Sequence, residues 1–573
     1  TRVGVSRPAE MLREGDVAGL ADVLGLDVSS VRRELAGDDR HVVLGEFRLD
    51  GATRERLLGF GSVTFDPRVR RVRYHGDMAL ALLGKVGLAG DGRTGVEALH
   101  DDRLAGRPGR VMEIRDAEGH VRERRAVVAP VDGADLVLTL DPHVQSIVEA
   151  ELERARQEAE AHRAQAVVMD PRTGSILAMA QAPALPGSGV EDEPVSHWRV
   201  VPATDVFEPG SVSKIFTAAS LLRRGVADTS TVFDGMGDQV KWGRASKDFG
   251  FGRPIRDVHA VGRVSLRHAF ARSSNIVFAT AAHELLQQDE LHADLRSFGL
   301  GRRPGLGLAG ESAGILRSPD HPLWSARSQA TLAIGQELAV TGLQLASAAS
   351  AVLTDGTLHR PRLVHAVRHA DGREEILEPV VARRGLVDAE VAATLRALCV
   401  DVVETPYGTA SRAAVAGLEV GGKTGTAQVS ERTGGYLPGL YNPTFVGFAP
   451  AHDPRLVVVV VLHRAEGEDV SGGANAAPCF SAIVREIAAS TTLLDGGIGA
   501  TVAPVASVRT PDLVGRSVAE IRELASRAPW GVGLPSLPRA GAVVGQLPLP
   551  GTPLLPGASI QLAFESGAAK GRP

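Results

Sequence analysis

Two apolar strand pairs, separated by a long helical stretch, constrain the fold of this chain most strongly. In the first pair, AVVMDPRTGSILAMA, two apolar runs flank the turn-forming DPRTG, a pattern typical of a β-hairpin. In the second pair, PTFVGFAP and RLVVVVVLHR flank the short turn AHDP. Helical patterns such as SKIFTAASLLRRG and TGLQLASAASAVLTDG lie between the two pairs. Strands at both ends with helices between them predict a sheet covered by helices.

The chain is too long for one compact core, and its 573 residues favour three or four domains. Short helical patterns mix with strands over residues 1–130, where no catalytic cluster occurs. Both strand pairs fall within residues 135–495. An Ala, Val, Pro and Thr-rich linker (496–509) then leads to a small module (510–566) and a tail (567–573) typical of disorder. We therefore expect an α+β multidomain protein.

Composition limits the classes of function. The net charge of −5 offers no basic surface for nucleic acid. The longest apolar run, Leu456–Leu462, is too short to cross a bilayer and is typical of a buried strand. Only two cysteines occur, Cys399 and Cys479, which excludes a disulfide scaffold and a zinc cluster and leaves either one pair or two buried thiols. We expect no metal and no cofactor.

Lysine is rare in this chain, which makes each lysine informative. Arginine supplies most of the 63 basic residues, and only six are lysine: Lys85, Lys214, Lys241, Lys247, Lys423 and Lys570. Lysine can lose its proton when it is buried, whereas arginine stays charged. A lysine kept against this bias hints at a site that needs a neutral amine.

The stretch FEPGSVSKIFTAASLL predicts a reactive serine. Glu-Pro-Gly interrupts regular structure, Ser211 then opens a helical pattern, and Lys214 follows one turn later on the same face. Free N–H groups at a helix N-terminus favour a developing negative charge. Burial would lower the pKa of Lys214, which could then take the serine proton. Taken alone, however, the S-x-x-K pattern fits an N-cap serine beside an exposed lysine better.

A second polar cluster, Ser273-Ser274-Asn275, lies within RHAFARSSNIVFATAAH. The Ser273 hydroxyl can relay a proton between Lys214 and a leaving group. The Asn275 amide offers both a donor and an acceptor to a substrate peptide. The alternative is that these residues only cap a helix, because Ser and Asn are good N-caps.

The stretch GLEVGGKTGTAQ supports two interpretations of one lysine. It fits G-x-x-x-x-G-K-[ST], which cradles phosphates, and it fits a K-T-G box, which binds a substrate carboxylate. A phosphate loop leads into a helix, but the Gly, Thr and Val residues after Lys423 favour a strand. On such a strand Lys423 would supply a fixed positive charge. Thr424 and Thr426 would share a face, and Gly425 would let a substrate backbone approach.

The motifs S-x-x-K (Ser211 to Lys214), S-x-N (Ser273 to Asn275) and K-T-G (Lys423 to Gly425) occur in this order along the chain. With them the sequence resembles the active-site serine penicillin-binding proteins. AVVMDPRTGSILAMAQAP, FEPGSVSK, LAIGQELAVTGLQLA, GGKTGTAQ, FVGFAP and GGANAAPCF are similar to that family's transpeptidase domain over residues 135–495. RVRYHGDMALALLG, GRTGVE and DRLAGRPG, within 1–130, resemble the pedestal (dimerisation-type) domain of the class B members. PDLVGRSVAEIRELA, VVGQLPLPG and LLPGASIQLAFE, within 510–566, resemble one PASTA domain. The resemblance implies a central antiparallel sheet flanked by helices in the transpeptidase domain.

The resemblance also implies the chemistry, that of a peptidoglycan D,D-transpeptidase. Ser211 would attack the D-Ala-D-Ala carbonyl of a stem peptide and form an acyl-enzyme, with Lys214 as the general base. Ser273 and Asn275 would relay the proton and bind the peptide. An amine of a second strand would then form the cross-link, and β-lactams would instead leave Ser211 acylated.

The same resemblance implies how the substrate is held. Lys423, Thr424, Gly425 and Thr426 would form the substrate-binding strand and bind the terminal carboxylate. The backbone N–H groups of Ser211 and Thr426 would form the oxyanion hole. Two departures from the family pattern occur outside the motif residues: WRVVPATDVFEPGS lacks an Asn-Arg-Ala segment, and Glu337 stands where Gly is common.

The implied partners are stem peptides, β-lactams, a membrane-embedded glycan polymerase and division-complex proteins, with no nucleic acid. The chain opens on TRVGVSRPAEML, which has neither an initiator Met nor a signal-like apolar core. We therefore expect a membrane anchor upstream of Thr1, with the catalytic domain on the extracytoplasmic side of the cytoplasmic membrane. A PASTA domain favours a division or sporulation role.

Other functions stay open. A β-lactamase, a β-lactam sensor or a D,D-carboxypeptidase could use the same fold, and a cell-wall-binding scaffold would use it without catalysis. No E-x-x-x-N pattern for deacylation occurs, which disfavours the common serine β-lactamase. Three intact motifs disfavour a loss of catalysis.

Overall fold

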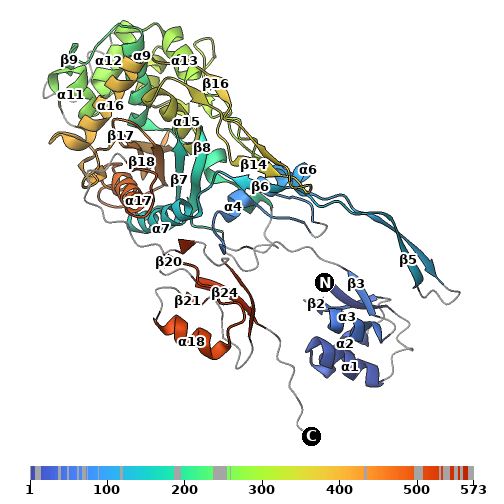
Figure 1. Ribbon diagram of the computed structural model, residues 1–573. Coiled ribbons are helices and arrows are strands. Elements are labelled where there is room, and N and C mark those ends of the chain that lie inside the picture. Colours follow the sequence, from blue (N-terminus) through green and yellow to red (C-terminus); the bar gives the residue numbers. More distant parts are fainter. Residues whose placement is uncertain are drawn as a thin grey trace.

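The structure is a computed structural model (Figure 1). It describes residues 2–6, 14–36, 41–47, 49, 51–60, 63–66, 73, 75–87, 90–115, 121–185, 195–235, 255–258, 260–431, 435–495, 508–527, 531–532, 542–547, 553–554 and 559–564. The expected tail and most of the expected linker lie outside these residues. None of the helices in the described ranges is long and apolar enough to cross a membrane.

A five-stranded antiparallel sheet forms the centre of the largest part of the chain, with strand order β17-β18-β19-β7-β8. Its strands are β7 (Arg163–Asp170), β8 (Ser175–Ala182), β17 (Gly421–Ser430), β18 (Tyr436–Ala449) and β19 (Leu456–His463). Both predicted strand pairs are therefore confirmed, as β7–β8 and β18–β19. The apolar run of β19 is buried at the middle of the sheet, which explains its lack of alternation. β17 is an edge strand.

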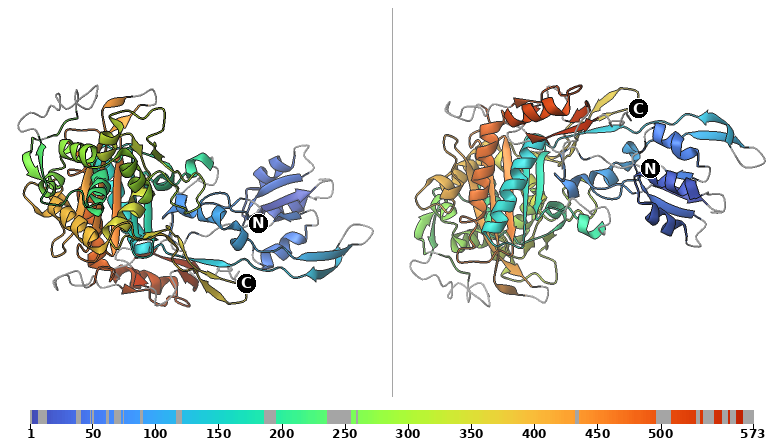
Figure 2. Two further views of the ribbon diagram at one scale, coloured as in Figure 1. Left: turned by 90° about the horizontal axis from the view of Figure 1, so that it is seen from above. Right: turned by 90° about the horizontal axis from the view of Figure 1, so that it is seen from below.

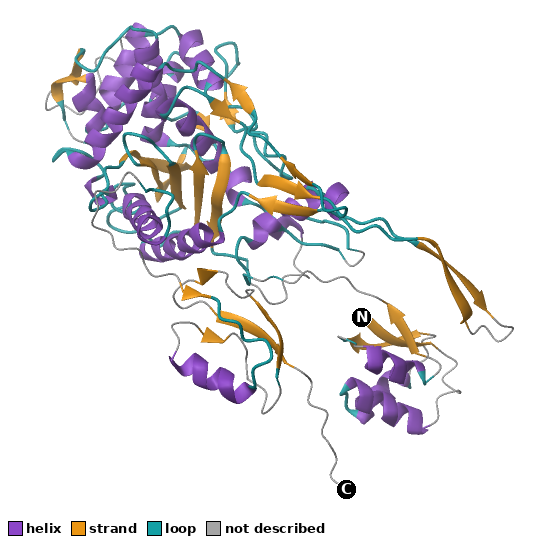
Figure 3. Ribbon diagram, viewed as in Figure 1, coloured by secondary structure: helices purple, strands orange, loops and turns teal. Residues whose placement is uncertain are grey.

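Helices cover both faces of this sheet (Figure 3). On one face lie α7 (Pro142–Glu158) and α17 (Ala476–Ser490), where the Phe445 and Phe480 rings meet at 4.9 Å between centroids. On the other face lies the almost wholly buried α15 (Gly342–Leu353). The prediction that Asp141 and Pro142 start a helix is confirmed, because the Asp141 carboxylate accepts a hydrogen bond from His143 N at 2.8 Å.

A helical region lies between β8 and β17 along the chain and covers the β17 side of the sheet (Figure 1). Its main helices are α9 (Lys214–Arg223), α11 (Leu266–Ala271), α12 (Asn275–Leu285), α13 (Gln288–Ser297), α14 (Ser328–Ala333) and α16 (Ala389–Glu404). Short elements connect them: α8 (Val201–Thr204), β9 (Val232–Gly235), β10 (Gly262–Ser265), β11 (Ile315–Leu316) and β12 (Leu338–Ala339). Most side chains of α9 and α12 are buried, so these helices are held by apolar packing.

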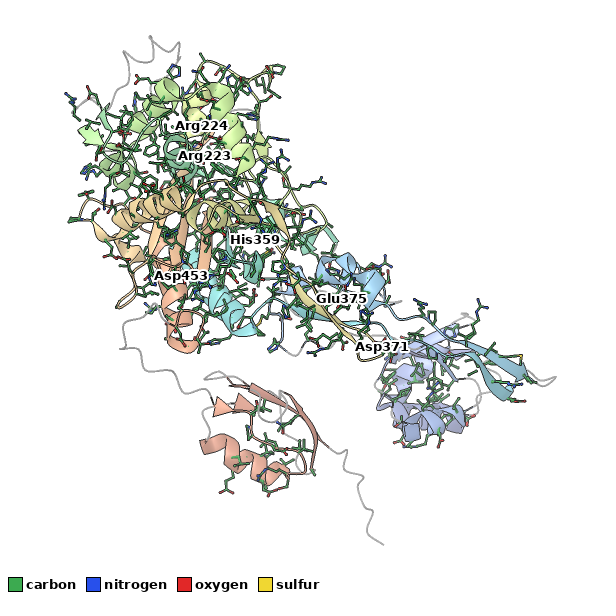
Figure 4. The ribbon with its side chains drawn as sticks, turned by 45° about the horizontal axis from the view of Figure 1, so that its top comes forward. Arg223, Arg224, His359, Asp371, Glu375 and Asp453 are labelled. Atoms are coloured by element: carbon green, nitrogen blue, oxygen red, sulfur yellow. The ribbon has the colours of Figure 1, made fainter. Side chains whose placement is uncertain are left out.

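A smaller three-stranded sheet, β15-β14-β6, adjoins the body and is built from β6 (Asp135–Leu138), β14 (Val364–Arg368) and β15 (Glu374–Ile376). β13 (Leu358–His359) pairs with β16 (Val381–Arg383). Figure 4 labels Asp371 and Glu375 on the hairpin of β14 and β15, toward the narrow part of the molecule. This hairpin therefore leads from the central sheet toward the N-terminal part.

The N-terminal part has its own apolar core, formed by Val3, Val5, Leu20, Val31 and Leu57 among others. Its sheet, β2-β1-β3, contains β1 (Arg2–Ser6), β2 (His41–Glu46) and β3 (Val63–Asp66), and its helices are α1 (Glu14–Leu24), α2 (Val28–Leu35) and α3 (Gly51–Leu58). Both views of Figure 2 show this sheet apart from the five-stranded one. A two-stranded ribbon, β4 (Arg110–Arg115) and β5 (Val121–Val128), follows the short helices α4 (Leu80–Leu83), α5 (Gly95–Leu99) and α6 (Asp101–Leu104).

The described C-terminal residues contain the predicted helix and strands. The helix is α18 (Val518–Arg527), and β24 (Ser559–Phe564) pairs with β22 (Val543–Leu547) and β21 (Gly531–Val532). A separate pair joins β20 (Val508–Arg509) to β23 (Pro553–Leu554). Leu513, Val518, Ile521 and Ile560 are buried, which gives this module a small core.

Candidate active site

Ser211 lies in a short 3₁₀ turn, Gly210–Ser213, that runs directly into α9. Gly210 has a φ of 56°, a left-handed conformation that favours glycine and turns the chain sharply before the helix. The side chain of Lys214 is wholly buried, whereas Ser211 is only partly buried. Lys214 Nζ lies 2.9 Å from Ser211 Oγ. The predicted proximity of hydroxyl and amine is therefore present.

Lys214 is surrounded by polar atoms from the turn before α12. Its Nζ donates to the backbone oxygen of Ser273 at 2.6 Å and to Asn275 Oδ1 at 2.7 Å, and it lies 3.3 Å from Ser273 Oγ. Burial, and next the charge of Lys423, hold the pKa of Lys214 well below its usual range, while Asp257 acts in the opposite direction. A buried amine of this kind can accept a proton from the adjacent hydroxyl.

The Ser273-Ser274-Asn275 cluster caps a helix, as one of its two alternatives predicts, and the relay and peptide-binding roles stay predictions. Ser274 is the N-cap of α12, since its Oγ accepts a hydrogen bond from Val277 N at 3.1 Å. Ser273 has a φ of 60°, a strained conformation for a residue other than glycine. In this conformation both Ser273 oxygens face Lys214. The cap thus positions the two polar residues that flank it.

Lys423 lies on β17, so the strand interpretation of the K-T-G stretch is correct and the phosphate-loop interpretation is wrong. The Nζ of Lys423 donates to Ser273 Oγ at 2.8 Å, and the side chain is wholly buried. Burial lowers the pKa of Lys423 to about 7, with an opposing effect from Cys399. The expected positive charge on Lys423 stays a prediction, and burial works against the charged form of this amine.

The two threonines share the face of β17 opposite to Lys423, as strand alternation requires. Thr424 Oγ1 lies 2.8 Å from Thr409 Oγ1, and Thr426 Oγ1 accepts a hydrogen bond from Gly472 N at 3.0 Å. The predicted common face is thus confirmed. Thr409 and Gly472 extend the candidate site beyond the residues found in the sequence.

Gly425 has a packing role that the sequence did not reveal. A Cβ at this position would lie 2.6 Å from the backbone oxygen of Pro209 and 3.0 Å from Val212 Cγ2. The missing side chain therefore lets β17 pack against the turn that carries Ser211. We expected the space for a substrate backbone, and it is occupied by the segment entering that turn.

Two further acidic groups, to which the sequence analysis assigned no role in the site, lie beside it. Asp257 is buried and binds the start of α12, through Ser274 Oγ at 2.6 Å and Ile276 N at 3.0 Å. Glu208 accepts hydrogen bonds from Tyr436 Oη at 2.9 Å and from Glu337 N at 3.1 Å. Glu208 could have been suspected from its position three residues before Ser211, but no local pattern marks Asp257.

Glu337, noted as a departure from the family pattern, occupies a left-handed position with a φ of 58°. Its carboxylate accepts hydrogen bonds from Ser328 Oγ at 2.7 Å and Thr331 Oγ1 at 2.9 Å. Burial raises the pKa of Glu208, and the hydrogen bonds from Tyr436 and from the Glu337 backbone lower it, while the charge of the Glu337 side chain raises it. The residue at position 337 therefore influences the protonation of Glu208, which lies three residues before Ser211.

The Ser211 hydroxyl lies beside the buried amine of Lys214, and the Ser273 hydroxyl lies between this amine and that of Lys423. This arrangement is typical of a serine acyl-transferring enzyme. The described residues contain no group of three or more His, Cys, Asp or Glu side chains that could hold a metal ion. Residues 164–485 match the penicillin binding protein transpeptidase domain. The chain belongs to the penicillin-binding protein transpeptidase family.

Relatives and solved structures agree with this assignment. Penicillin-binding protein PbpB of Mycolicibacterium smegmatis is 33% identical over 473 residues, which cover 80% of this chain and 70% of that protein. The probable peptidoglycan D,D-transpeptidase PenA of Neisseria gonorrhoeae is 30% identical over 483 residues, which cover 83% and 78%. The crystal structure of penicillin binding protein 3 of Mycobacterium tuberculosis complexed with aztreonam has a TM-score of 0.62 and 29% identity, covering 75% of this chain and 92% of that one.

Proposed function

We propose that this protein is a peptidoglycan D,D-transpeptidase in which Ser211 is the nucleophile and Lys214 the general base. The observation that carries the proposal is the 2.9 Å separation of Ser211 Oγ from Lys214 Nζ, an amine that is wholly buried. Burial holds the pKa of Lys214 well below its usual range, which favours the neutral amine that can accept a proton. The name of the PenA relative, a probable peptidoglycan D,D-transpeptidase, supports the same reaction class.

The reaction has two acyl-transfer steps. Lys214 takes the Ser211 proton as Oγ attacks the carbonyl carbon between the two terminal D-Ala residues of a stem peptide. The C–N bond then breaks, and the departing amine receives a proton from Lys214 through Ser273 Oγ. The amine of a second stem peptide attacks the ester and gives a proton to Lys214. The C–O bond to Ser211 breaks, and Lys214 returns the proton to Ser211 Oγ as the cross-link forms. A β-lactam would complete only the first step and stay attached to Ser211.

Lys423 is proposed to bind the terminal carboxylate of the substrate together with Thr424 and Thr426. A carboxylate beside Lys423 would raise the pKa of this lysine from about 7 and favour its charged form. The amine also donates to Ser273 Oγ. Carboxylate binding and the proton relay would then be linked through one hydroxyl.

The backbone N–H groups of Ser211 and Thr426 are proposed to form the oxyanion hole. Ser211 lies in the turn that opens α9, and Thr426 follows the glycine that lets β17 approach this turn. Such a donor is typically worth about 3–4 kcal/mol in the transition state. Asn275, held against Lys214, would bind the backbone of the stem peptide.

Intact mass spectrometry after incubation with a penicillin tests the nucleophile. The wild-type protein should gain the mass of one acyl group, and Ser211→Ala should gain none. Ser213→Ala provides a matched control, because Ser213 is a buried serine of the same turn and should leave the adduct intact. A short-lived adduct would indicate a β-lactamase instead. The absence of any adduct on the wild type would contradict catalysis and favour the wall-binding scaffold.

We further propose that residues 1–130 form a class B pedestal domain and that residues 510–566 form a PASTA domain joined by the linker 496–509. The motif resemblance and the small α/β core around α18 support the second assignment. A truncated protein ending at residue 495 should keep its acylation rate and lose affinity for cell-wall fragments. Unchanged wall binding would leave the module as a folding or docking appendage.

The same family supports a membrane-anchored protein whose catalytic domain lies outside the cytoplasmic membrane. A glycan polymerase and division-complex proteins would be the partners there. Protease treatment of intact cells that carry the natural protein should digest the catalytic domain. Normal septation after depletion of the protein would contradict the proposed division role.

A further inference from the structure

Asp257 is a buried carboxylate that holds the start of α12. The residue is 6% exposed. Oδ2 accepts a hydrogen bond from Ser274 Oγ at 2.6 Å, and Oδ1 accepts from Ile276 N at 3.0 Å and from Asn275 N. No ion pair to Asp257 is present within the part of the chain that the structure describes. Three hydrogen bonds at the N-terminus of α12 therefore hold this carboxylate in place.

Two hydrogen bonds to neighbouring residues, Asp257 and Arg256, hold Asn275 in place. Its backbone N–H donates to Asp257, and its side-chain Nδ2 donates to the backbone oxygen of Arg256 at 2.8 Å. Asn275 Oδ1 then points at Lys214 Nζ, 2.7 Å away. The segment containing Arg256 and Asp257 thus fixes both the position and the orientation of the amide that contacts the general base.

We propose that Asp257 is a positioning residue for acyl transfer, which aligns Asn275 and Ser273 with Lys214 and supplies a buried negative charge near the Lys214 amine. This inference rests on the proposed roles of Ser211 and Lys214. It goes beyond them because Asp257 belongs to none of the three motifs and contacts no reacting atom. It predicts a change in the proton affinity of Lys214 as well as a loss of alignment.

The expected change in the pKa of Lys214 follows from the groups around its amine. The uncharged partners are Ser211, Ser273 and Asn275, and the Phe278 ring lies 6.0 Å from Nζ. The charged neighbours are Lys423, which lowers the pKa of Lys214, and Asp257, which raises it. Removing the charge of Asp257 should therefore lower the pKa of Lys214 further. The acid limb of the acylation rate, which reports protonation of the base, should move to lower pH.

The test is the pH dependence of acylation by a fluorescent penicillin, measured for the wild type and for Asp257→Asn. The variant keeps the shape of the side chain and removes its charge. We expect the plateau rate to fall by about tenfold to a hundredfold, because a misplaced catalytic contact costs rates of that order. We also expect the midpoint of the acid limb to lie at lower pH than in the wild type. Should Asp257→Asn fail to fold, Asp257→Ser, which keeps one oxygen acceptor, gives the same comparison.

Two controls separate this role from a general loss of stability. Asp294 is also buried, and it pairs with Arg223 at 3.1 Å and Arg224 at 2.7 Å, the two arginines labelled in the helical region of Figure 4. Asp294→Asn should lower the melting temperature and leave the pH midpoint unchanged. Ser274→Ala keeps the charge of Asp257 but removes one hydrogen bond, so it should slow acylation without moving the midpoint.

The outcomes are distinct. A folded Asp257→Asn protein with the wild-type midpoint, or an equal shift in Asp294→Asn, would overturn the inference. A wild-type protein that is not acylated at all would instead contradict the proposed function of Ser211. A shifted midpoint confined to the Asp257 variants would establish Asp257 as a positioning residue.

Discussion

Lys423 Nζ lies 2.8 Å from the Ser273 hydroxyl, although the two residues are 150 positions apart in the chain. Lys214 Nζ approaches the same hydroxyl at 3.3 Å. Two buried amines therefore share one serine, and the charge of Lys423 lowers the pKa of Lys214. The Ser273 hydroxyl is therefore the polar group through which the two buried lysines are connected.

Replacing Lys423 with Met should abolish efficient acylation and stabilise the fold at acidic and neutral pH. The pKa of Lys423 is about 7 in the folded chain against 10.5 for an ordinary lysine. Between these values the unfolded state binds more protons, so this group makes stability increase with pH there. Below pH 7 the buried charge costs on the order of a few kcal/mol.

Thermal melting of Lys423→Met and the wild type across that pH window measures the effect. The gain in melting temperature should be largest near pH 7 and below, and should shrink as pH approaches 10.5. A gain that does not depend on pH would mean that packing, and not charge, causes it.

Ser273→Ala should slow acylation while leaving Ser211 and Lys214 in place. The variant removes the hydroxyl between the two amines, and a relay of this kind contributes about 10²–10⁴-fold. Stopped-flow measurement with a chromogenic cephalosporin would give the rate. Ser220→Ala is the matched control, because Ser220 is a buried serine of α9 whose hydroxyl donates only within its own helix, to Phe216 O at 3.0 Å. Equal rates in the two variants would exclude the relay.

Glu337 provides a test of backbone strain next to the nucleophile segment. Glu337→Ala loses the hydrogen bonds from Ser328 and Thr331 and keeps a side chain at a φ of 58°. Glu337→Gly loses the same bonds but relieves the strained conformation. Denaturant unfolding should therefore show the Gly variant about 1 kcal/mol more stable than the Ala variant. The opposite order would show that this conformation carries no strain.

The two cysteines should be inert to alkylation in the folded protein. Cys399 and Cys479 are unpaired and buried, and burial raises the pKa of the Cys399 thiol to about 12 and that of the Cys479 thiol above its usual range. The thiolate, which is the reactive form, is thus scarce. Mass spectrometry after iodoacetamide should show two additions in denaturant and none without it. Labelling of the native protein would reveal local opening of α16 or α17.

Much of the architecture could be predicted because it is recorded in local patterns. The hairpin of β7 and β8, the strands β18 and β19 and the start of α7 at Asp141 each follow from residues that lie next to one another in the sequence. Ser211 and Lys214 are likewise close because they lie one helical turn apart in the sequence. Periodicity and capping are local effects, so a sequence shows them directly.

The sequence by itself determined the three motifs, the strand character of the K-T-G stretch and the resemblance to a family. Only the tertiary structure decided that Lys423 is buried with a pKa near 7, that Gly425 makes room for Pro209, and that Asp257 holds the start of α12. Burial and hydrogen-bond partners depend on segments that are distant in the chain, and desolvation sets the charge of a lysine only after those segments have packed around it.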